Sequence, residues 1–273
     1  MAAEVVITSE GLQQRSVVAR LRTTSSLLRL WIVRDLRARY RFSSLRASWS
    51  VIQPVVLLAT YGWVFTAVLD VGEEQVPYLS FAWAGLVVYS YAAQCLGAGV
   101  GSLLDAGFVV SKVYFPREVV PLAVVGVATV DLAITGTILL VLSWVQIGPP
   151  TIHVLGALLA LVMMVVLMAA TTTIVAALAV SLRDVRHVMP LVVRVLFIIT
   201  PVMYSIELIE VHGSWLGTLN PLTVAMEAVR DGALRHRWPA FAPLLGYLSA
   251  SIALCYVAIR FVWRAERSMT DRL

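Results

Sequence analysis

Long apolar runs separated by short polar connections make up most of this chain. A transmembrane helix needs about 20 mostly apolar residues, and we interpret six runs as spans, of which the fifth is the shortest. The runs cover residues 47–69, 79–104, 119–145, 152–181, 188–204 and 241–263. The pattern therefore predicts an all-α polytopic membrane protein with six transmembrane helices.

Basic residues gather on alternate connections, which predicts the orientation of the spans. Nine arginines precede the first span, and lysine or arginine also occurs in the second-to-third connection, the fourth-to-fifth connection and the C-terminal tail. Residues 70–78 carry only acidic charges and residues 143–151 carry none. By the positive-inside rule both termini lie in the cytoplasm. Only the fifth-to-sixth connection, with Arg230, Arg235 and Arg237, departs from this pattern.

Residues 24–46 are predicted to form a basic amphipathic helix ahead of the first span. Trp31 lies on its apolar face, whereas Arg34, Arg37 and Arg41 lie on the opposite face at helical spacing. Such a helix suits a flat position at the membrane interface. The alternative, a solvated helix, would leave the apolar stripe with nothing to cover. Residues 1–23 before it are predicted to be a flexible cytoplasmic N-terminus.

Residues 205–239 are too polar to span a bilayer and contain several glycines and prolines. We interpret them as two short re-entrant helices between the fifth and sixth spans, joined near Asn220-Pro221. Irregular backbone at membrane depth needs shielding by protein or a water-filled cavity. The segment is therefore predicted to cap the external mouth of a pathway; its gate residues are Trp215, Asn220, Pro221 and Glu227. An ordinary surface loop is the alternative. Residues 47–264 then form the transmembrane domain and residues 265–273 a cytoplasmic tail.

Composition supports the membrane class. Apolar residues make up 60% of the chain and charged residues 14%, whereas soluble proteins carry about 25% charged residues. Cys95 and Cys255 both lie inside apolar runs, so we interpret them as small hydrophobic residues rather than a disulfide or metal pair. A basic N-terminal arm can bind nucleic acid. Because membrane spans follow it at once, we predict contact with anionic membrane lipid and no nucleic-acid partner.

Catalytic chemistry has few candidates in this chain. The only lysine, Lys112, follows Ser111, so the Gly-Lys pair of a phosphate-binding loop is missing. The four histidines are scattered over different connections. The chain is therefore predicted not to be an enzyme and to hold no cofactor or metal of its own.

Predicted spans contain ionisable residues, and two of these lie at depth. Asp131 lies near the middle of the third span and Arg194 lies in the fifth. A carboxylate at that depth costs about 2.5–3.5 kcal/mol, so it should face protein or water. A proton relay needs several such groups, so structural pairing, or protonated Asp131 bonding Thr135 or a neighbouring helix, is favoured. Arg194 either pairs, extends to the interface or contacts a phosphate. Glu227 and Arg230, one turn apart, indicate a local pair.

An ordered set of motifs carries a family resemblance. The motifs are Arg39-Tyr40-Arg41 leading to Trp49, Gln53-Pro54, Val113-Tyr114-Phe115-Pro116-Arg117-Glu118, Leu182-Arg183-Asp184-Val185-Arg186, Thr200-Pro201-Val202 and Asn220-Pro221-Leu222-Thr223. From about residue 25 to the C-terminus the chain resembles permease subunits of type-2 ABC exporters for polysaccharides such as O-antigen or teichoic acid. The resemblance implies a subunit of an ATP-driven exporter that moves a lipid-linked polysaccharide across the bacterial cytoplasmic (inner) membrane. It also implies a homodimer with two copies of a separate ATPase subunit that holds ATP and Mg.

The same resemblance implies roles for two groups of residues. The loop expected to contact the ATPase subunit contains Lys112, Tyr114, Phe115, Pro116, Arg117 and Glu118, of which Arg117 and Glu118 would offer charge at that surface. The glycan is expected to pass along the first and fifth spans, beside Trp49, Gln53, Tyr61, Phe65, Phe197, Thr200 and Tyr204. Trp49 could equally anchor its span at the interface. Thr200-Pro201 is predicted to kink the fifth span.

Other functions remain as alternatives. A permease of the same architecture could move a drug or simple lipid. An ion-coupled secondary transporter would need internal inverted repeats and several buried charges, and a membrane enzyme would need clustered catalytic groups. We find no clear repeat, one central carboxylate and scattered histidines, which favours the exporter.

Overall fold

The computed structural model describes residues 17–41, 52, 55–56, 58–60, 63, 76–107, 116–206, 217 and 219–270. Within these ranges the secondary structure is helical and contains no strand. The main helices are α2 (Val17–Arg41), α4 (Tyr78–Asp105), α6 (Val119–Gln146), α7 (Val154–Ser181), α8 (Asp184–Ile199), α11 (Pro221–Ala233) and α12 (Phe241–Thr270). The predicted all-α class is confirmed.

Four of these helices are long and apolar enough to cross a membrane. The candidate spans among the described residues are Tyr78–Gly99, Val119–Gln146, Val154–Ser181 and Phe241–Arg264. They correspond to the second, third, fourth and sixth predicted runs. The fifth run forms α8, which has only 16 residues, fewer than the about 20 that a span requires. The first run lies mostly outside the described residues.

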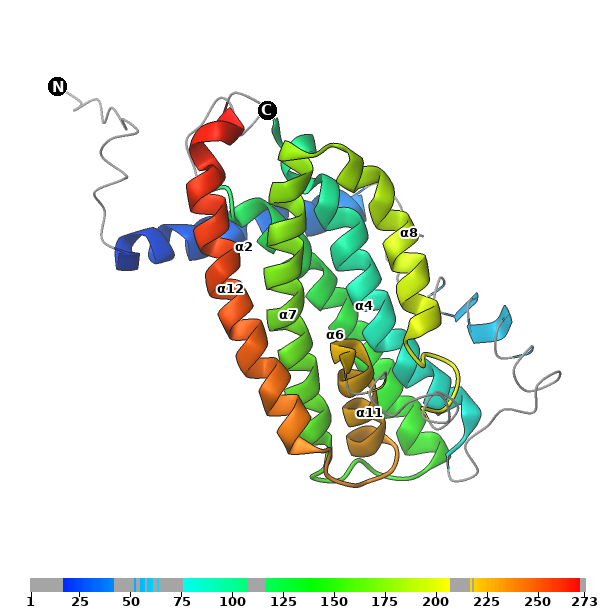
Figure 1. Cartoon of the computed structure of the whole chain (residues 1–273). Helices are drawn as coiled ribbons and strands as arrows, with labels where there is room; N and C mark the ends of the chain where they lie inside the picture. Colours follow the sequence, from blue (N-terminus) through cyan, green and yellow to red (C-terminus); the bar gives the residue numbers. More distant parts are fainter. Residues whose placement is uncertain are drawn as a thin grey trace.

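The four spans run side by side, and α7 contacts the other three, whereas α4 is the most buried of them (Figure 1). In the span Tyr78–Gly99, 72% of the most apolar stretch is buried inside the protein, compared with 17% for α12. Helix α8 lies beside α4, and the short α11 lies toward the end of the bundle where α6 finishes and α7 begins. Helix α2 crosses the bundle near its other end, where α12 finishes. Helix α4 packs against α6, α7, α8 and α11, whereas α12 packs mainly on α7 and α2 packs on α6.

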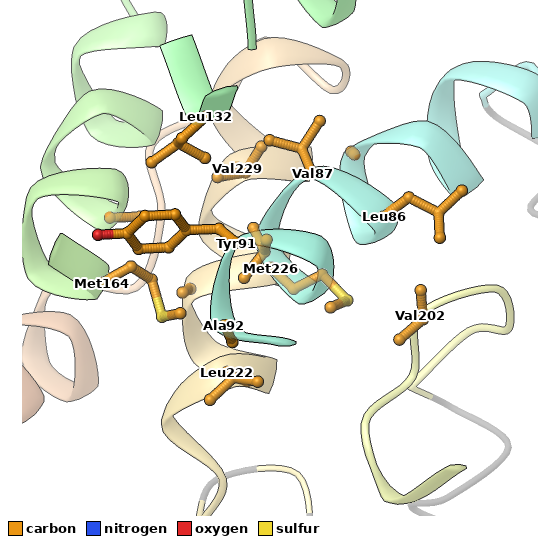
Figure 2. Packing of buried hydrophobic residues seen from close by; sticks show 14 of the residues in the cluster. Leu86, Val87, Tyr91, Ala92, Leu132, Met164, Val202, Leu222, Met226 and Val229 are labelled. Carbon is orange, nitrogen blue, oxygen red and sulfur yellow. The ribbon is translucent and has the colours of Figure 1, made fainter. Parts of the chain in front are cut away.

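The main hydrophobic core forms where α4, α6, α7 and α11 meet (Figure 2). From α4 it includes Leu86, Val87 and Tyr91, and from α11 it includes Met226 and Val229. Val202, from the segment after α8, also belongs to this cluster. A short helix that does not cross the bilayer therefore supplies part of the central core.

Small residues allow the helices to approach closely, as is common in membrane bundles. A Cβ atom on Gly99 of α4 would collide with the Thr172 side chain of α7. A Cβ atom on Gly232 of α11 would lie 2.6 Å from the His153 carbonyl oxygen and 2.9 Å from the Ala157 nitrogen. The atoms that Gly232 would meet belong to the backbone of α7 and the residue before it, and backbone atoms cannot rotate away. Helix α11 therefore lies directly against the first turn of α7.

Helix α2 is one-sided, as the sequence predicts, but it begins at Val17, so residues 17–23 are helical and the prediction of a flexible segment up to residue 23 is wrong there. Leu27, Trp31 and Ile32 are half-buried, whereas Arg34 and Arg37 are exposed. Ile32 packs against Gly126 of α6, and Trp31 packs on a second apolar cluster formed by the neighbouring ends of the spans. The apolar stripe of α2 therefore covers α6 instead of facing solvent.

We predict that Gly232→Ala lowers the free energy of unfolding by about 1–3 kcal/mol, the usual cost of overpacking. The added methyl group would collide with the α7 backbone. Thermal unfolding in detergent measures the effect. The matched control is Gly246→Ala on α12, where a Cβ atom meets nothing within 4 Å; this change should be neutral or slightly stabilising. Equal unfolding temperatures for the two variants would contradict the close α7–α11 contact.

Candidate functional site

The junction between α8 and α11 brings several predicted residues together. Helix α8 ends at Ile199, and Thr200 has an extended backbone with φ −90° and ψ 132°. The residue before a proline disfavours the helical conformation, so Pro201 explains this end. The predicted kink within the fifth span is therefore wrong: Thr200-Pro201 terminates the helix. As a result, the carbonyl groups of residues 201 and 202 need partners from elsewhere.

Arg230 of α11 supplies those partners. Its side chain is fully buried, and Nη2 donates to the carbonyl oxygens of Pro201 at 3.0 Å and Val202 at 2.8 Å. Nη1 donates to Glu227 Oε1 at 2.7 Å. The guanidinium carbon lies 3.6 Å from the ring centroid of Phe81 on α4, a cation–π contact. One side chain thus joins α11, the segment after α8, and α4.

Gly85 makes room for this arrangement. A Cβ atom at Gly85 would collide with the Val202 carbonyl and lie 3.0 Å from Arg230 Nη2. Only glycine allows the irregular backbone after α8 to reach α4 so closely. We define the Arg230 cluster as Phe81, Gly85, Val202, Glu227 and Arg230. Its members come from α4, the segment after α8 and α11, and they pack against one another.

Asn220 makes the second link between α8 and α11. Its Oδ1 accepts from the Leu222 backbone nitrogen at 3.0 Å, capping α11, and Pro221 occupies the first helical turn. Its Nδ2 donates to Thr200 Oγ1 at 2.9 Å. Three of the predicted gate residues, Asn220, Pro221 and Glu227, therefore lie on one helix that is fixed to the end of α8. Trp215, the fourth, lies outside the described residues.

Acidic and basic side chains continue from Glu227 toward the C-terminal end of α11. Arg235 Nη1 lies 2.8 Å from Glu227 Oε2 and 2.7 Å from Asp231 Oδ1, and Arg237 Nε lies 2.7 Å from the same Asp231 oxygen. Burial opposes ionisation of Glu227, but Arg230 and Arg235 outweigh it and hold its pKa below the ordinary value. Stability from the ionised Glu227 is therefore present at neutral pH and is lost only as acid protonates it.

The residues predicted to line the glycan path on the fifth span differ in burial and in their contacts. Phe197 is half-buried and packs edge-on against Tyr89 of α4 with ring centroids 4.8 Å apart. Thr200 is fully buried, so its hydroxyl serves Asn220. The Tyr204 hydroxyl donates to the Ile198 carbonyl oxygen at 2.7 Å. Trp49, Gln53, Tyr61 and Phe65 lie outside the described residues.

At the opposite end of the bundle, Pro116, Arg117 and Glu118 lead into α6. Arg117 is only 7% exposed and Glu118 only 4%, and Trp263 Nε1 of α12 donates to Glu118 Oε1 at 3.2 Å. In this chain both charges turn inward, so the expectation that they offer charge at a surface needs correction. The cause is the packing of the first turn of α6 beside α12. Lys112, Tyr114 and Phe115 lie outside the described residues.

An exposed ion pair lies near the same end. Arg186, from the predicted Leu182–Arg186 motif, donates to Asp105 Oδ1 at 3.0 Å and joins the start of α8 to the end of α4. Both side chains are about half exposed, so the pair contributes at most about 1 kcal/mol.

Asp131 is bonded by a neighbouring helix. Gln94 Nε2 of α4 donates to Asp131 Oδ2 at 2.7 Å, and the Thr135 hydroxyl donates to the Asp131 backbone oxygen. Arg194 is exposed on α8. Among the roles considered for Asp131, these contacts support a hydrogen bond from a neighbouring helix.

The fold and these junctions define a multi-span helical membrane protein with a short helix fixed among the spans. In the described part of the chain, no group of three or more His, Cys, Asp or Glu side chains could hold a metal ion. The sequence matches the ABC-2 type transporter family over residues 26–234. The chain belongs to that family.

Relatives agree with this assignment. The chain is 28% identical over 229 residues to the O-antigen export system permease protein RfbA of Myxococcus xanthus, covering 83% of this chain and 87% of the relative. It is 26% identical over 227 residues to a Klebsiella pneumoniae protein of the same name, covering 81% and 86%. The family match over residues 26–234 includes Thr200, Asn220 and Arg230.

Sequence reasoning missed the central role of Arg230. It identified the Glu227–Arg230 spacing as a local pair, and the pair exists, but the bonds to residues 201 and 202 span a long sequence separation. The available signal was an arginine on the apolar side of a short helix: Ala225, Met226 and Val229 around it are all buried. A buried arginine needs several partners, and the proline break at Thr200-Pro201 supplies free carbonyls.

We predict that Arg230→Met lowers the free energy of unfolding by about 3–5 kcal/mol, the usual cost of breaking a buried ion pair. Arg230→Lys keeps the charge but cannot reach both carbonyls and Glu227 together, so it should cost about 1–3 kcal/mol. Thermal unfolding of the purified chain measures both.

The control is Arg237→Lys, which changes an arginine of the same network whose side chain is 62% exposed. Its stability should match that of the unmodified chain within about 1 kcal/mol. An Arg230→Lys variant as stable as this control would show that the carbonyl contacts contribute nothing.

We predict a coupling free energy of about 0.5–3 kcal/mol between Glu118 and Trp263. Trp263→Phe keeps an aromatic ring and removes the indole donor, while Glu118→Gln removes the charge. Unfolding of the two single variants and the double variant completes the cycle. Trp144→Phe, at a tryptophan that is 63% exposed, controls for the loss of an indole group. If the stability changes of the two single variants simply add in the double variant, the Glu118–Trp263 hydrogen bond does not contribute to stability.

Proposed function

We propose that this chain is the membrane subunit of an ATP-driven exporter that moves a lipid-linked polysaccharide, resembling O-antigen or teichoic acid, across the bacterial cytoplasmic membrane. The observation that carries the proposal is the family match over residues 26–234, together with relatives named as O-antigen export permeases that align along more than four fifths of this chain. Transport subunits of this kind bind cargo and move it, and ATP hydrolysis belongs to a separate subunit.

The proposed architecture has six spans with both termini in the cytoplasm, and the fifth span would consist of α8 together with the segment that follows it to Tyr204. The directions of the described spans support this architecture. Helices α4 and α7 run toward the end of the bundle where α12 finishes, and α6 runs away from it (Figure 1). The charge pattern puts the α12 end in the cytoplasm. Helix α2 then lies at the cytoplasmic interface with Arg34 and Arg37 toward lipid headgroups. Helix α11 is the re-entrant helix on the extracytoplasmic side.

The proposed path runs between two copies of the chain along the first and fifth spans. Helix α8 supports this because much of one face is apolar and exposed in the single chain, including Leu191, Val195 and Ile198. The Arg230 cluster attaches the extracytoplasmic end of this face to α11. A gate formed by α11 would therefore be mechanically connected to the wall of the path.

The proposed contact with two ATPase subunits lies around residues 112–118. Because Arg117 and Glu118 turn inward, their contribution in this proposal is to position the loop through Trp263 and α12. The charges that meet the ATPase would come from other residues of the loop, such as Lys112. ATP and Mg are held by the partner, and this chain contributes no residue to their binding.

We predict that the chain copurifies with its ATPase subunit as two copies of each, and that lipid-linked glycan stimulates ATP hydrolysis by the complex in vesicles. Light scattering of the purified complex gives the stoichiometry, and phosphate release gives the stimulation. The ATPase subunit without this chain is the control and should show no response to glycan. Transport that follows an ion gradient and needs no ATPase would replace the proposal with a secondary transporter, and stimulation by a drug or simple lipid alone would change the cargo.

A further inference from the structure

A groove of about 610 Å³ runs between α6 and α7. Val87 of α4 and Val229 and Ala233 of α11 form its buried floor, and residues of α6 from Thr129 to Leu140 and of α7 from Val154 to Val166 form its walls. The groove is separate from the Arg230 cluster and from the path proposed along α8.

The walls of the groove offer almost no hydrogen-bonding groups to a polar ligand. Thr129 and Thr137 are the hydroxyl-bearing residues that line the groove. Each hydroxyl donates to a carbonyl of its own helix, at Val125 and Ala133 respectively. The other lining residues are aliphatic or glycine. A sugar or phosphate would lose hydrogen bonds to water here without replacement, so the groove fits an alkyl chain.

Gly136 keeps the groove hollow. A Cβ atom built there meets nothing within 4 Å, so no neighbouring helix in the described structure requires glycine at this position. Glycine within a helix costs about 0.5–1 kcal/mol relative to alanine. No neighbouring side chain of the described residues fills the space beside Gly136, so that space is open to a molecule from outside the chain.

The groove opens onto the surface that faces lipid. Ile134 and Leu158 at its sides are large, apolar and exposed, on two helices that are themselves candidate spans. The wall from Thr129 to Leu140 covers about 17 Å at a rise of about 1.5 Å per residue, close to one leaflet of a hydrocarbon core about 30 Å thick. It lies toward the end of the bundle where α6 finishes.

Exposed aromatic side chains mark that end. Trp144 near the end of α6 is 63% exposed, and Trp238 is 47% exposed beside His153 and Phe241. Tryptophan at such positions belongs to the interface between headgroups and acyl chains. The groove therefore begins at headgroup level and extends inward by about one leaflet.

We propose that the α6–α7 groove is a binding site for one acyl chain of a membrane glycerophospholipid. The occupant follows from three observations: the groove continues the lipid-facing surface, it has the length of one leaflet, and its lining is aliphatic. The site does not depend on the proposed transport function. In the proposed orientation the groove lies in the extracytoplasmic leaflet, and only this assignment rests on the proposed function.

The test uses the full-length chain in vesicles of phosphatidylethanolamine and phosphatidylglycerol that contain a phospholipid with a photoreactive diazirine on one acyl chain. After illumination, mass spectrometry compares labelling of the groove walls with labelling of the exposed face of α12 around Ile252 and Tyr256, which reports ordinary lipid contact. We expect the groove walls to be labelled several-fold more strongly. Gly136→Leu, which fills the groove, should abolish that excess.

Gly246→Leu on α12 is the matched control, since a Cβ atom there also meets nothing within 4 Å. It should leave the excess at the groove unchanged. Thermal unfolding confirms that both variants fold, and Gly136→Ala provides a smaller filling step if leucine does not fold. Labelling equal to that of α12, or an excess that persists in Gly136→Leu, would overturn the site.

Two other occupants give distinct results that also overturn the proposal. If a second copy of the chain fills the groove, its walls will be unlabelled and Gly136→Leu will change the oligomeric state. If the polyprenyl tail of a cargo fills it, added polyprenyl phosphate will displace the phospholipid label, whereas an equal amount of unlabelled phospholipid will not.

Discussion

The structure depends on a buried guanidinium group that satisfies backbone carbonyls exposed by a helix break. Helix α8 stops because Thr200-Pro201 cannot continue it, and carbonyls left unpaired in an apolar interior are costly. Arg230 donates to both Pro201 and Val202, and it keeps its charge because Glu227 pairs with it and Phe81 lies beneath it. Arginine suits this position because its planar fork can reach several acceptors at once.

That interaction requires small residues in the surrounding helices. Gly85 allows the segment after α8 to touch α4, and Gly232 allows α11 to touch α7. Asn220 caps α11 and also bonds Thr200, so it adds a second link between α11 and the end of α8 to the one made by Arg230. A short helix that would be marginal alone is thus held by packing and hydrogen bonds on three sides.

Four of the six predicted runs correspond to helices long enough to cross a membrane, because these runs end at residues that a bilayer excludes; the third run, 119–145, corresponds to α6, Val119–Gln146. Periodicity also identifies the face of α2 that carries Trp31. It cannot identify contacts between distant segments. Arg230 looks like one half of a local pair, and Glu118 looks like a loop charge, because their partners Val202 and Trp263 lie elsewhere in the chain. The Thr200-Pro201 break is visible in the sequence, but only the structure distinguishes an end from a kink.

Helix α8 is attached unequally at its two ends. At the Thr200 end the Arg230 cluster and Asn220 hold it through buried contacts. At the Asp184 end, the pair between Arg186 and Asp105 is about half exposed and contributes at most about 1 kcal/mol. Val185 and Met189 also pack this end of α8 against the main core, so the Asp184 end is held mainly by apolar packing and the Thr200 end also by buried hydrogen bonds. In the proposed orientation the Asp184 end would face the ATPase subunit, so the exposed pair between Arg186 and Asp105 would lie on that side of the bundle.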